Sequence, residues 1–279
     1  MLSLTSVIWH LDEPPPRPAL LPDGEEMSWP RVSRVSIQAD HHTSFDLPSY
    51  FPSARDISLN TGAWSTQLSN IPFISRLRSV DGTWSDIKAV VDAGATHLKR
   101  VVTRSYVLDE IDFPSCLPST IRSLSFSSRS IRRDADELRE LISSCPQLTF
   151  LSIAFKAAHL DHCNESLDLI LAHISGLPLK ALQLAWINND FRRVDYRGRL
   201  ESFIITVSDL LPSLRVLSFA WATGVVYWTR TVVAEEGKAL SYGRLREVPA
   251  EDGSDDLAWY DREYEAEQDE DTIDKNQQP

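Results

Sequence analysis

The feature that most limits the fold of this chain is one short apolar pattern that returns along most of its length. Its clearest copy is Leu214-x-x-Leu217-x-Phe219, and Leu148-x-x-Leu151-x-Ile153 repeats the same arrangement of residue types. The other copies are Leu4/Val7/Trp9, Val32/Val35/Ile37, Ala54/Ile57/Leu59, Ile74/Leu77/Ser79, Leu98/Val101/Thr103, Ile121/Leu124/Phe126 and Leu179/Leu182/Leu184. Self-similarity at a spacing of roughly 20 to 35 residues is typical of a repeat architecture.

Each copy fits a short strand followed by a return segment. Because successive strand residues face opposite sides, the last two apolar positions of a copy share one face. Parallel strands stacked side by side bury that face along a continuous core, which a single strand cannot do. Helical spacing marks four return segments, at Ile87/Val90/Val91, Leu138/Leu141/Ile142, Leu167/Ile170/Leu171/Ile174 and Leu200/Phe203/Ile204/Val207. The sequence therefore predicts an α/β solenoid, with parallel strands on its concave face and helices or irregular segments on its convex face.

The amino-acid sequence of the copies resembles that of a known family. The phrases LPSTIRSLSF and LPSLRVLSF are similar to the irregular leucine-rich repeats that follow the F-box in fungal F-box-like proteins. This resemblance covers roughly Leu4 to Ala222, and it implies substrate recognition for a ubiquitin ligase, with the F-box binding the ligase adaptor. The first copy already begins at Leu4, so no F-box is recognisable. Either the module is absent or the sequence is a truncated gene model.

Charge is distributed unevenly along the chain. The net charge is −12, and residues 251–279 contribute −10 of it, with 12 Asp or Glu against 2 Lys or Arg, so residues 1–250 carry only −2. Such an acidic segment cannot bury enough apolar surface to offset its chain entropy. We therefore expect three parts: an irregular leucine-rich-repeat domain at 1–222, a cap of one or two short strands at 223–250, and a disordered acidic tail at 251–279.

Strand residues that point away from the core should line the concave surface and bind a partner. This surface is basic in the early copies and aromatic in the late ones, and Arg and Trp are the types most enriched at binding hot spots. The candidate partner-binding residues are Arg34, Arg76, Arg78, Arg100, Arg104, Phe150, Phe155, Trp186 and Trp221. The alternative is that the two tryptophans pack between neighbouring copies. A further hypothesis has the acidic tail compete with the partner for the early arginines.

Motifs for catalysis and cofactor binding are missing. The sequence contains no G-x-G-x-x-G, no G-x-x-x-x-G-K-[ST] and no G-x-S-x-G. The segment HLDHC holds four potential metal ligands, His159, Asp161, His162 and Cys163, yet no second cluster lies near it. A polar loop leading into a helix explains that segment more simply than a metal site. We therefore expect neither an enzyme nor a bound metal or other cofactor.

Composition also narrows the class of partner and the cellular location. The near-neutral body and the acidic tail argue against nucleic-acid binding. No stretch approaches the roughly 18 apolar residues of a membrane span, and three cysteines in 279 residues favour a reducing compartment. We expect an intracellular protein-recognition scaffold that resembles the substrate-binding repeats of an F-box receptor. The alternative is a free-standing leucine-rich-repeat interaction protein with no link to ubiquitin.

Overall fold

The structure is a computed structural model of the full chain. It describes residues 6–11, 28–39, 47–59, 71–106, 117–128, 135–155, 163–186, 196–221, 224–233 and 241–261. The chain divides into two compact units, Met1–Ile121 and Arg122–Pro279. We describe each unit by itself.

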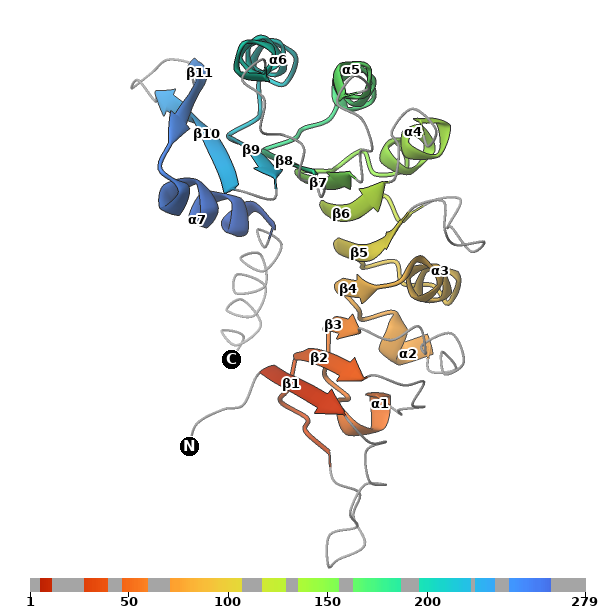
Figure 1. The fold of residues 1–279 in the computed structure, drawn as a ribbon. Helices are drawn as coiled ribbons and strands as arrows, with labels where there is room; N and C mark the ends of the chain where they lie inside the picture. Colours follow the sequence, from red (N-terminus) through yellow and green to blue (C-terminus); the bar gives the residue numbers. More distant parts are fainter. Residues whose placement is uncertain are drawn as a thin grey trace, which may run out of the picture. The chain divides into compact units, whose positions relative to one another are not determined.

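The first unit alternates short strands with short helices, in the order β1 (Ser6–Leu11), β2 (Arg34–Ala39), α1 (Leu47–Tyr50), β3 (Asp56–Leu59), α2 (Ile71–Ile74), β4 (Ser79–Gly82), α3 (Trp84–Asp92) and β5 (Arg100–Tyr106). Neighbouring strands pair in parallel from β1 through β5. Figure 1 shows α1, α2 and α3 on one side of these strands. Each helix is thus part of the return segment between two parallel strands.

The second unit continues the alternation with longer helices, in the order β6 (Ser123–Ser128), α4 (Ala135–Ser143), β7 (Phe150–Phe155), α5 (Cys163–Ile174), β8 (Ala181–Trp186), α6 (Tyr196–Leu210), β9 (Val216–Trp221), β10 (Gly224–Val233), β11 (Ser241–Val248) and α7 (Ala250–Asp261). Strands β6 to β9 are parallel, whereas β10 is antiparallel to both β9 and β11. The strands expected at 223–250 are therefore present as β10 and β11. The architecture is α/β with a mostly parallel sheet.

Middle residues of successive copies lie directly opposite each other in the sheet. Val7 pairs with Val35 and Val35 with Ile57, and in the second unit Leu124, Leu151, Leu182 and Leu217 form one unbroken series. All four leucines are fully buried. The four predicted helices are confirmed as α3, α4, α5 and α6. The repeat spacing read from the sequence thus sets the strand register.

One copy was aligned wrongly. The sequence suggested Ile74/Leu77/Ser79, but Ile74 ends α2, and it is Val80 that pairs with Ile57 and Val101. The true copy is Leu77-x-x-Val80-x-Gly82, shifted by three residues. Its last position is Gly82 rather than a large apolar residue, so the pattern is weak. The upstream Ile74 therefore fitted the first position of the pattern equally well.

A backbone ladder joins the copies at the edge of the sheet where the strands begin. The residues two before the middle positions form what we call the edge row. In most copies the carbonyl of this residue accepts hydrogen bonds from two N–H groups of the next copy. Arg55 O accepts from Arg78 N at 2.8 Å and Ser79 N at 3.2 Å, and Lys180 O accepts from Arg215 N at 2.7 Å and Val216 N at 3.0 Å. The edge row consists of Ser33, Arg55, Arg78 and Lys99 in the first unit and Arg122, Thr149, Lys180 and Arg215 in the second.

Local signals fix the best-defined helix of the first unit, α3. The Thr83 hydroxyl accepts a hydrogen bond from Asp86 N, and the Asp86 carboxylate accepts one from Thr83 N at 2.9 Å, which completes a capping box. Gly94, a glycine placed where a helix should end, follows the last turn with φ of 91°. Residues with a side chain rarely adopt this backbone conformation, so glycine at this position favours the end of the helix.

The acidic C-terminal segment differs from expectation. Residues 251–261 are not disordered, because they lie in α7, on the side of the second unit's strands opposite α4, α5 and α6 (Figure 1). Helix α7 contacts β8, β9 and β10. Leu257 packs among Phe150, Ala181, Val216 and Tyr227, and this apolar cluster offsets the cost of ordering an acidic segment. The remainder of the expected tail, 262–279, lies outside the described residues.

Candidate functional site

The side of the sheet opposite the return helices carries one row of side chains that is continuous within each unit (Figure 1). It is formed by the residue directly before each middle position, and we call it the face row. Register pairs these residues across neighbouring strands. The face row consists of Ser6, Arg34, Asp56, Ser79 and Arg100 in the first unit and Ser123, Phe150, Ala181 and Val216 in the second.

In the first unit the face row is polar and its members are linked. Arg34 Nε lies 3.8 Å from an Asp56 carboxylate oxygen, and Arg100 Nη1 donates to Ser79 Oγ at 3.5 Å. Beside them, Ser58 donates to Asp81 at 3.0 Å. The Arg34 side chain is 45 % exposed, so its guanidinium is open to solvent although it pairs with a carboxylate. Parallel pairing therefore presents charged and hydroxyl groups at the regular strand spacing.

Two of the predicted early arginines, Arg76 and Arg78, have other positions than the sequence suggested. Arg76 precedes β4 and donates through Nε to Pro72 O at 3.0 Å, so it closes the turn after α2. Arg78 belongs to the edge row rather than to the face of the sheet. Both errors follow from the three-residue shift of that copy. The backbone of Arg104 lies in β5, and its side chain is outside the described part of the structure.

The predicted aromatic docking residues at the strand ends are buried. Phe155 and Trp186 are only 3 % and 6 % exposed, and their rings lie 5.3 Å apart. Trp186 also stacks on Phe219 at 5.4 Å. These positions lie four residues after the middle residue, so strand alternation turns them toward the helix-side core. The expectation that they face a partner is wrong, and Trp186 packs between copies instead. Trp221 lies in β9, but its side chain is outside the described residues.

Phe150 does lie on the face row, but α7 covers it. Gly253 of α7 lies against Tyr227 of β10, Leu257 packs on Phe150, and Ser123 of β6 donates to Asp261 at 2.6 Å. A helix of 12 residues is about 18 Å long, and four strand spacings from β10 to β6 are about 19 Å, so the lengths match. The second unit therefore covers its own face row with its C-terminal helix.

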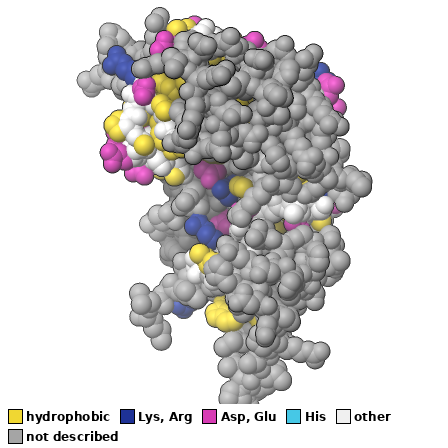
Figure 2. All heavy atoms as spheres, in the orientation of Figure 1, with side chains coloured by type: hydrophobic (Ala, Val, Ile, Leu, Met, Phe, Trp, Pro, Cys, Tyr) yellow, Lys and Arg dark blue, Asp and Glu magenta, His cyan; other side chains and the backbone are white. Residues whose placement is uncertain are grey.

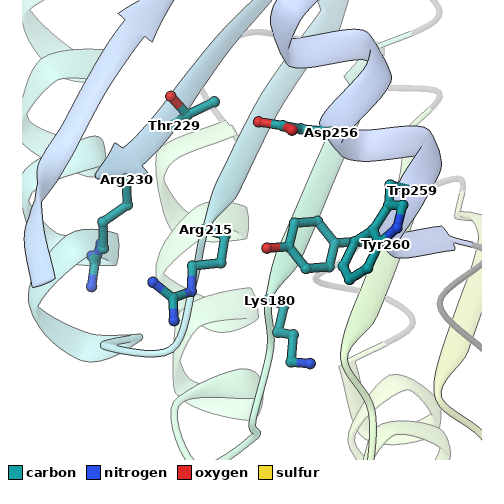
Figure 3. Close-up of a pocket in the computed structure, with 7 residues that line it drawn as sticks. All are labelled: Lys180, Arg215, Thr229, Arg230, Asp256, Trp259 and Tyr260. Carbon is teal, nitrogen blue, oxygen red and sulfur yellow. The ribbon is translucent and has the colours of Figure 1, made fainter. Parts of the chain in front are cut away.

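Helix α7 and the edge row line an open cavity of about 420 Å³ within the second unit. Figure 3 shows Asp256, Trp259 and Tyr260 projecting from α7, with the basic side chains on the strand side. The lining residues are Lys180, Arg215, Thr229, Arg230, Asp256, Trp259 and Tyr260. Three basic and one acidic side chains give this cavity a formal charge of +2, although the whole chain is acidic.

Backbone hydrogen bonds link the three basic residues, one after another, across neighbouring strands. Arg215 N donates to Lys180 O at 2.7 Å, and Arg230 N donates to Arg215 O at 2.8 Å. Arg230 as a whole residue is only 7 % exposed. Its guanidinium donates hydrogen bonds to Ser208 O at 2.7 Å and to Pro212 O at 2.8 Å, at the C-terminal end of α6. Burial lowers the pKa of Arg230, nearby Arg215 lowers it further, and Asp209 opposes the shift. Arg230 therefore contributes charge to the cavity while its donors serve the helix end.

Sequence reasoning missed every residue that lines the cavity. The edge row was readable once the copies were aligned, because its members are basic in six of the eight positions given above. The aromatic wall was hidden inside an acidic segment. Gly253, Leu257 and Tyr260 follow helical spacing of i, i+4 and i+7, and that pattern was the available signal for α7.

The described residues form neither a metal site nor a membrane-spanning helix. Among the described residues no group of three potential metal ligands comes together. His159, Asp161 and His162 lie outside these residues, and only the backbone of Cys163 is described, at the start of α5. In the same part of the chain, no helix has both the length and the apolar character needed to cross a bilayer.

Comparison with known proteins adds no assignment. Searches of protein-family models, of curated protein sequences and of solved structures each find no match to this chain.

Proposed function

We propose that this protein is a recognition scaffold of leucine-rich-repeat type, an α/β solenoid that binds a protein partner on the side of its strands opposite the return helices. The in-register face row of the first unit carries this proposal. On neighbouring parallel strands it places the exposed Arg34 and the half-buried Arg100 beside the largely buried Asp56 and Ser79. Charged groups at fixed spacing favour one complementary partner and disfavour like-charged ones.

The repeating backbone supports the solenoid part of the proposal. Parallel strands alternate with return helices, and the two-acceptor ladder of the edge row recurs from copy to copy. Repeat arrays use such surfaces for binding because each copy adds one strand and one set of outward side chains. The resemblance to F-box-like proteins gives the specific form of the proposal, which is substrate recognition for a ubiquitin ligase.

The division of the face row supports a partner site in the first unit. In the second unit the row turns apolar at Phe150, Ala181 and Val216, and α7 covers those residues. In the first unit the row is polar, and polar side chains can stay in contact with water without a helix or strand that covers them. A polar, partly solvent-exposed row can exchange its water contacts for contacts with a partner.

The test is affinity purification of the tagged protein from its own cells after mild crosslinking, with two variants in parallel. We expect the double change Arg34→Ala and Arg100→Ala to lose the specific partners. Arg139→Ala is the matched control, because Arg139 is an exposed arginine of α4 paired with Asp136 at 3.1 Å. Partners that survive the double change and the control equally would contradict the proposal.

The same purification separates the two forms of the function. Recovery of a ubiquitin-ligase adaptor with the wild-type protein would support the F-box-related form. Specific partners without any ligase component would leave a free-standing interaction scaffold, and the ubiquitin form would then be wrong.

A further inference from the structure

We propose that α7 is a displaceable cover over an apolar groove of the second unit, and that an acidic amphipathic helix of a protein partner docks in this groove in place of α7. The groove is formed by Phe150, Ala181 and Val216 of the face row together with Tyr227 of β10. We call it the α7 groove. The inference goes beyond the polar face row of the first unit and does not depend on it.

The α7 groove has the character of a helix-binding surface. Phe150, Ala181 and Val216 pair in register across three neighbouring strands, and Tyr227 lies on the next strand. All four residues are at most 8 % exposed while α7 covers them. Without α7 they would form one contiguous apolar patch, and such a patch on a folded protein typically marks an interaction site. The structure shows that a helix fits there.

Helix α7 buries little of its own surface. Only Gly253 and Leu257 are buried among its 12 residues, all of which the structure describes. Leu257 is therefore the one large side chain that anchors the helix fully, while Tyr260 packs against the same cluster in part. Ser123 adds a hydrogen bond to Asp261 at the end of the helix. Elements with few buried apolar contacts are among the first parts of a protein to open.

The sequence of α7 forms a helix poorly by itself. A glycine at position 253 lowers the helix propensity. Like charges lie four residues apart in two pairs, Glu251 with Asp255 and Asp252 with Asp256, and such pairs destabilise a helix. Acidic side chains, drawn in magenta, gather where this helix lies (Figure 2). The groove therefore holds α7 in its helical form, and a better helix with the same contacts can replace it.

The contacts of α7 define the kind of helix that docks. A glycine faces Tyr227, where the helix backbone approaches the strand most closely, and a leucine four residues later fills the cluster. Basic side chains on the strand side line the neighbouring cavity opposite the acidic α7, so a replacing helix is acidic as well (Figure 3). Docking of such a helix by its apolar face is an established mode of peptide recognition.

The test uses the full purified chain and fluorescence polarisation. The probe is a labelled peptide of residues 249–261 with blocked ends, in which Ser254→Ala and Asp255→Ala raise the helix propensity at exposed positions. We expect weak binding to the wild type, because α7 competes with the probe from within the same molecule. Leu257→Ala in the chain removes the anchor of α7, so the probe should bind this variant about tenfold more tightly or better.

Matched controls connect the gain of affinity to the groove. Leu210→Ala changes an exposed leucine of α6 in the same unit and should leave the affinity unchanged. A second peptide that also carries Leu257→Ala should fail to bind any form of the chain. A misfolded chain would bind both peptides alike, so the pair of peptides separates binding in the groove from misfolding. Gly253→Ala in the chain should increase the affinity for the first peptide as well, because it also loosens α7.

Several outcomes would overturn the proposal. These are equal affinity of the wild type and the Leu257→Ala chain, equal binding of the two peptides, or the same gain for Leu210→Ala. Dimerisation of the Leu257→Ala chain without binding of the probe, measured by analytical ultracentrifugation, would assign the groove to a second copy instead of a partner. The chain with Arg34→Ala and Arg100→Ala should bind the probe as the wild type does, so the two proposals can fail separately.

Discussion

Gly253 of α7 lies so close to Tyr227 of β10 that a Cβ atom at Gly253 would overlap the Cβ and Cγ atoms of the tyrosine. Tyr227 is only 8 % exposed and packs in the same cluster as Leu257. Glycine is a poor helix former, so its presence in the first half of α7 needs a reason. The reason is the close approach of the helix backbone to the strand.

Gly253→Ala should loosen α7 from the sheet. Alanine gains about 1 kcal/mol of helix propensity, but overpacking costs about 1–3 kcal/mol, and the overlapping atoms are next to the Tyr227 backbone and cannot move aside easily. Hydrogen exchange followed by mass spectrometry should show faster exchange across α7. Ser254→Ala, at an exposed position one residue later, is the control and should exchange no faster than the wild type.

Arg230→Met should destabilise the second unit. The guanidinium donates to Ser208 O, Ser208 Oγ and Pro212 O, so its loss leaves carbonyls at the end of α6 without these donors. Loss of hydrogen bonds from a charged group costs about 1.5–3 kcal/mol. Urea denaturation should show the loss, and the same change at exposed Arg246 should alter the free energy of unfolding by less than about 0.5 kcal/mol. Equal effects of the two changes would contradict the role of Arg230.

Cys145 should resist alkylation in the native protein. Its side chain is fully buried, and burial raises the pKa of the thiol to about 11, although a hydrogen bond with Ser144 opposes the shift. The thiolate is the reactive form, so little of it exists at pH 8. Peptide mapping after iodoacetamide treatment should find Cys145 unmodified until the protein is denatured. Labelling as fast as that of glutathione in the same tube would show that the site is open.

The protein should become less stable as the pH decreases below 6.5, partly because of His173. Burial lowers the pKa of this histidine below its ordinary value of 6.5, Arg139 of α4 lowers it further, and Asp136 opposes the shift. The unfolded chain therefore takes up the proton first, so this contribution is complete above pH 6.5 and is lost as the pH falls below it. Urea midpoints measured from pH 7.5 to 5.0 should decline less for His173→Gln than for the wild type. Parallel curves for the two proteins would show that His173 is not involved.

The apolar periodicity of the sequence determined the strands, their parallel pairing and the helices α3 to α6. Leu151, Leu182 and Leu217 are opposite each other because the same three-position pattern occurs once in each copy. The pattern is weak around Val80, because this copy ends in Gly82 and the upstream Ile74 also fits the first position. Local patterns fix local structure, and a three-residue ambiguity moves two arginines off the face of the sheet.

Only the tertiary structure decided which surfaces are free. Phe155 and Trp186 follow their strands in sequence just as a docking residue would, but alternation along the strand buries both. Residues 251–261 are acidic enough to predict disorder, yet Leu257 finds an apolar cluster contributed by β7, β8, β9 and β10. The sequence contained each of these residues, but the free energy that orders α7 comes from contacts between positions far apart in the chain, and single-sequence patterns do not contain such contacts.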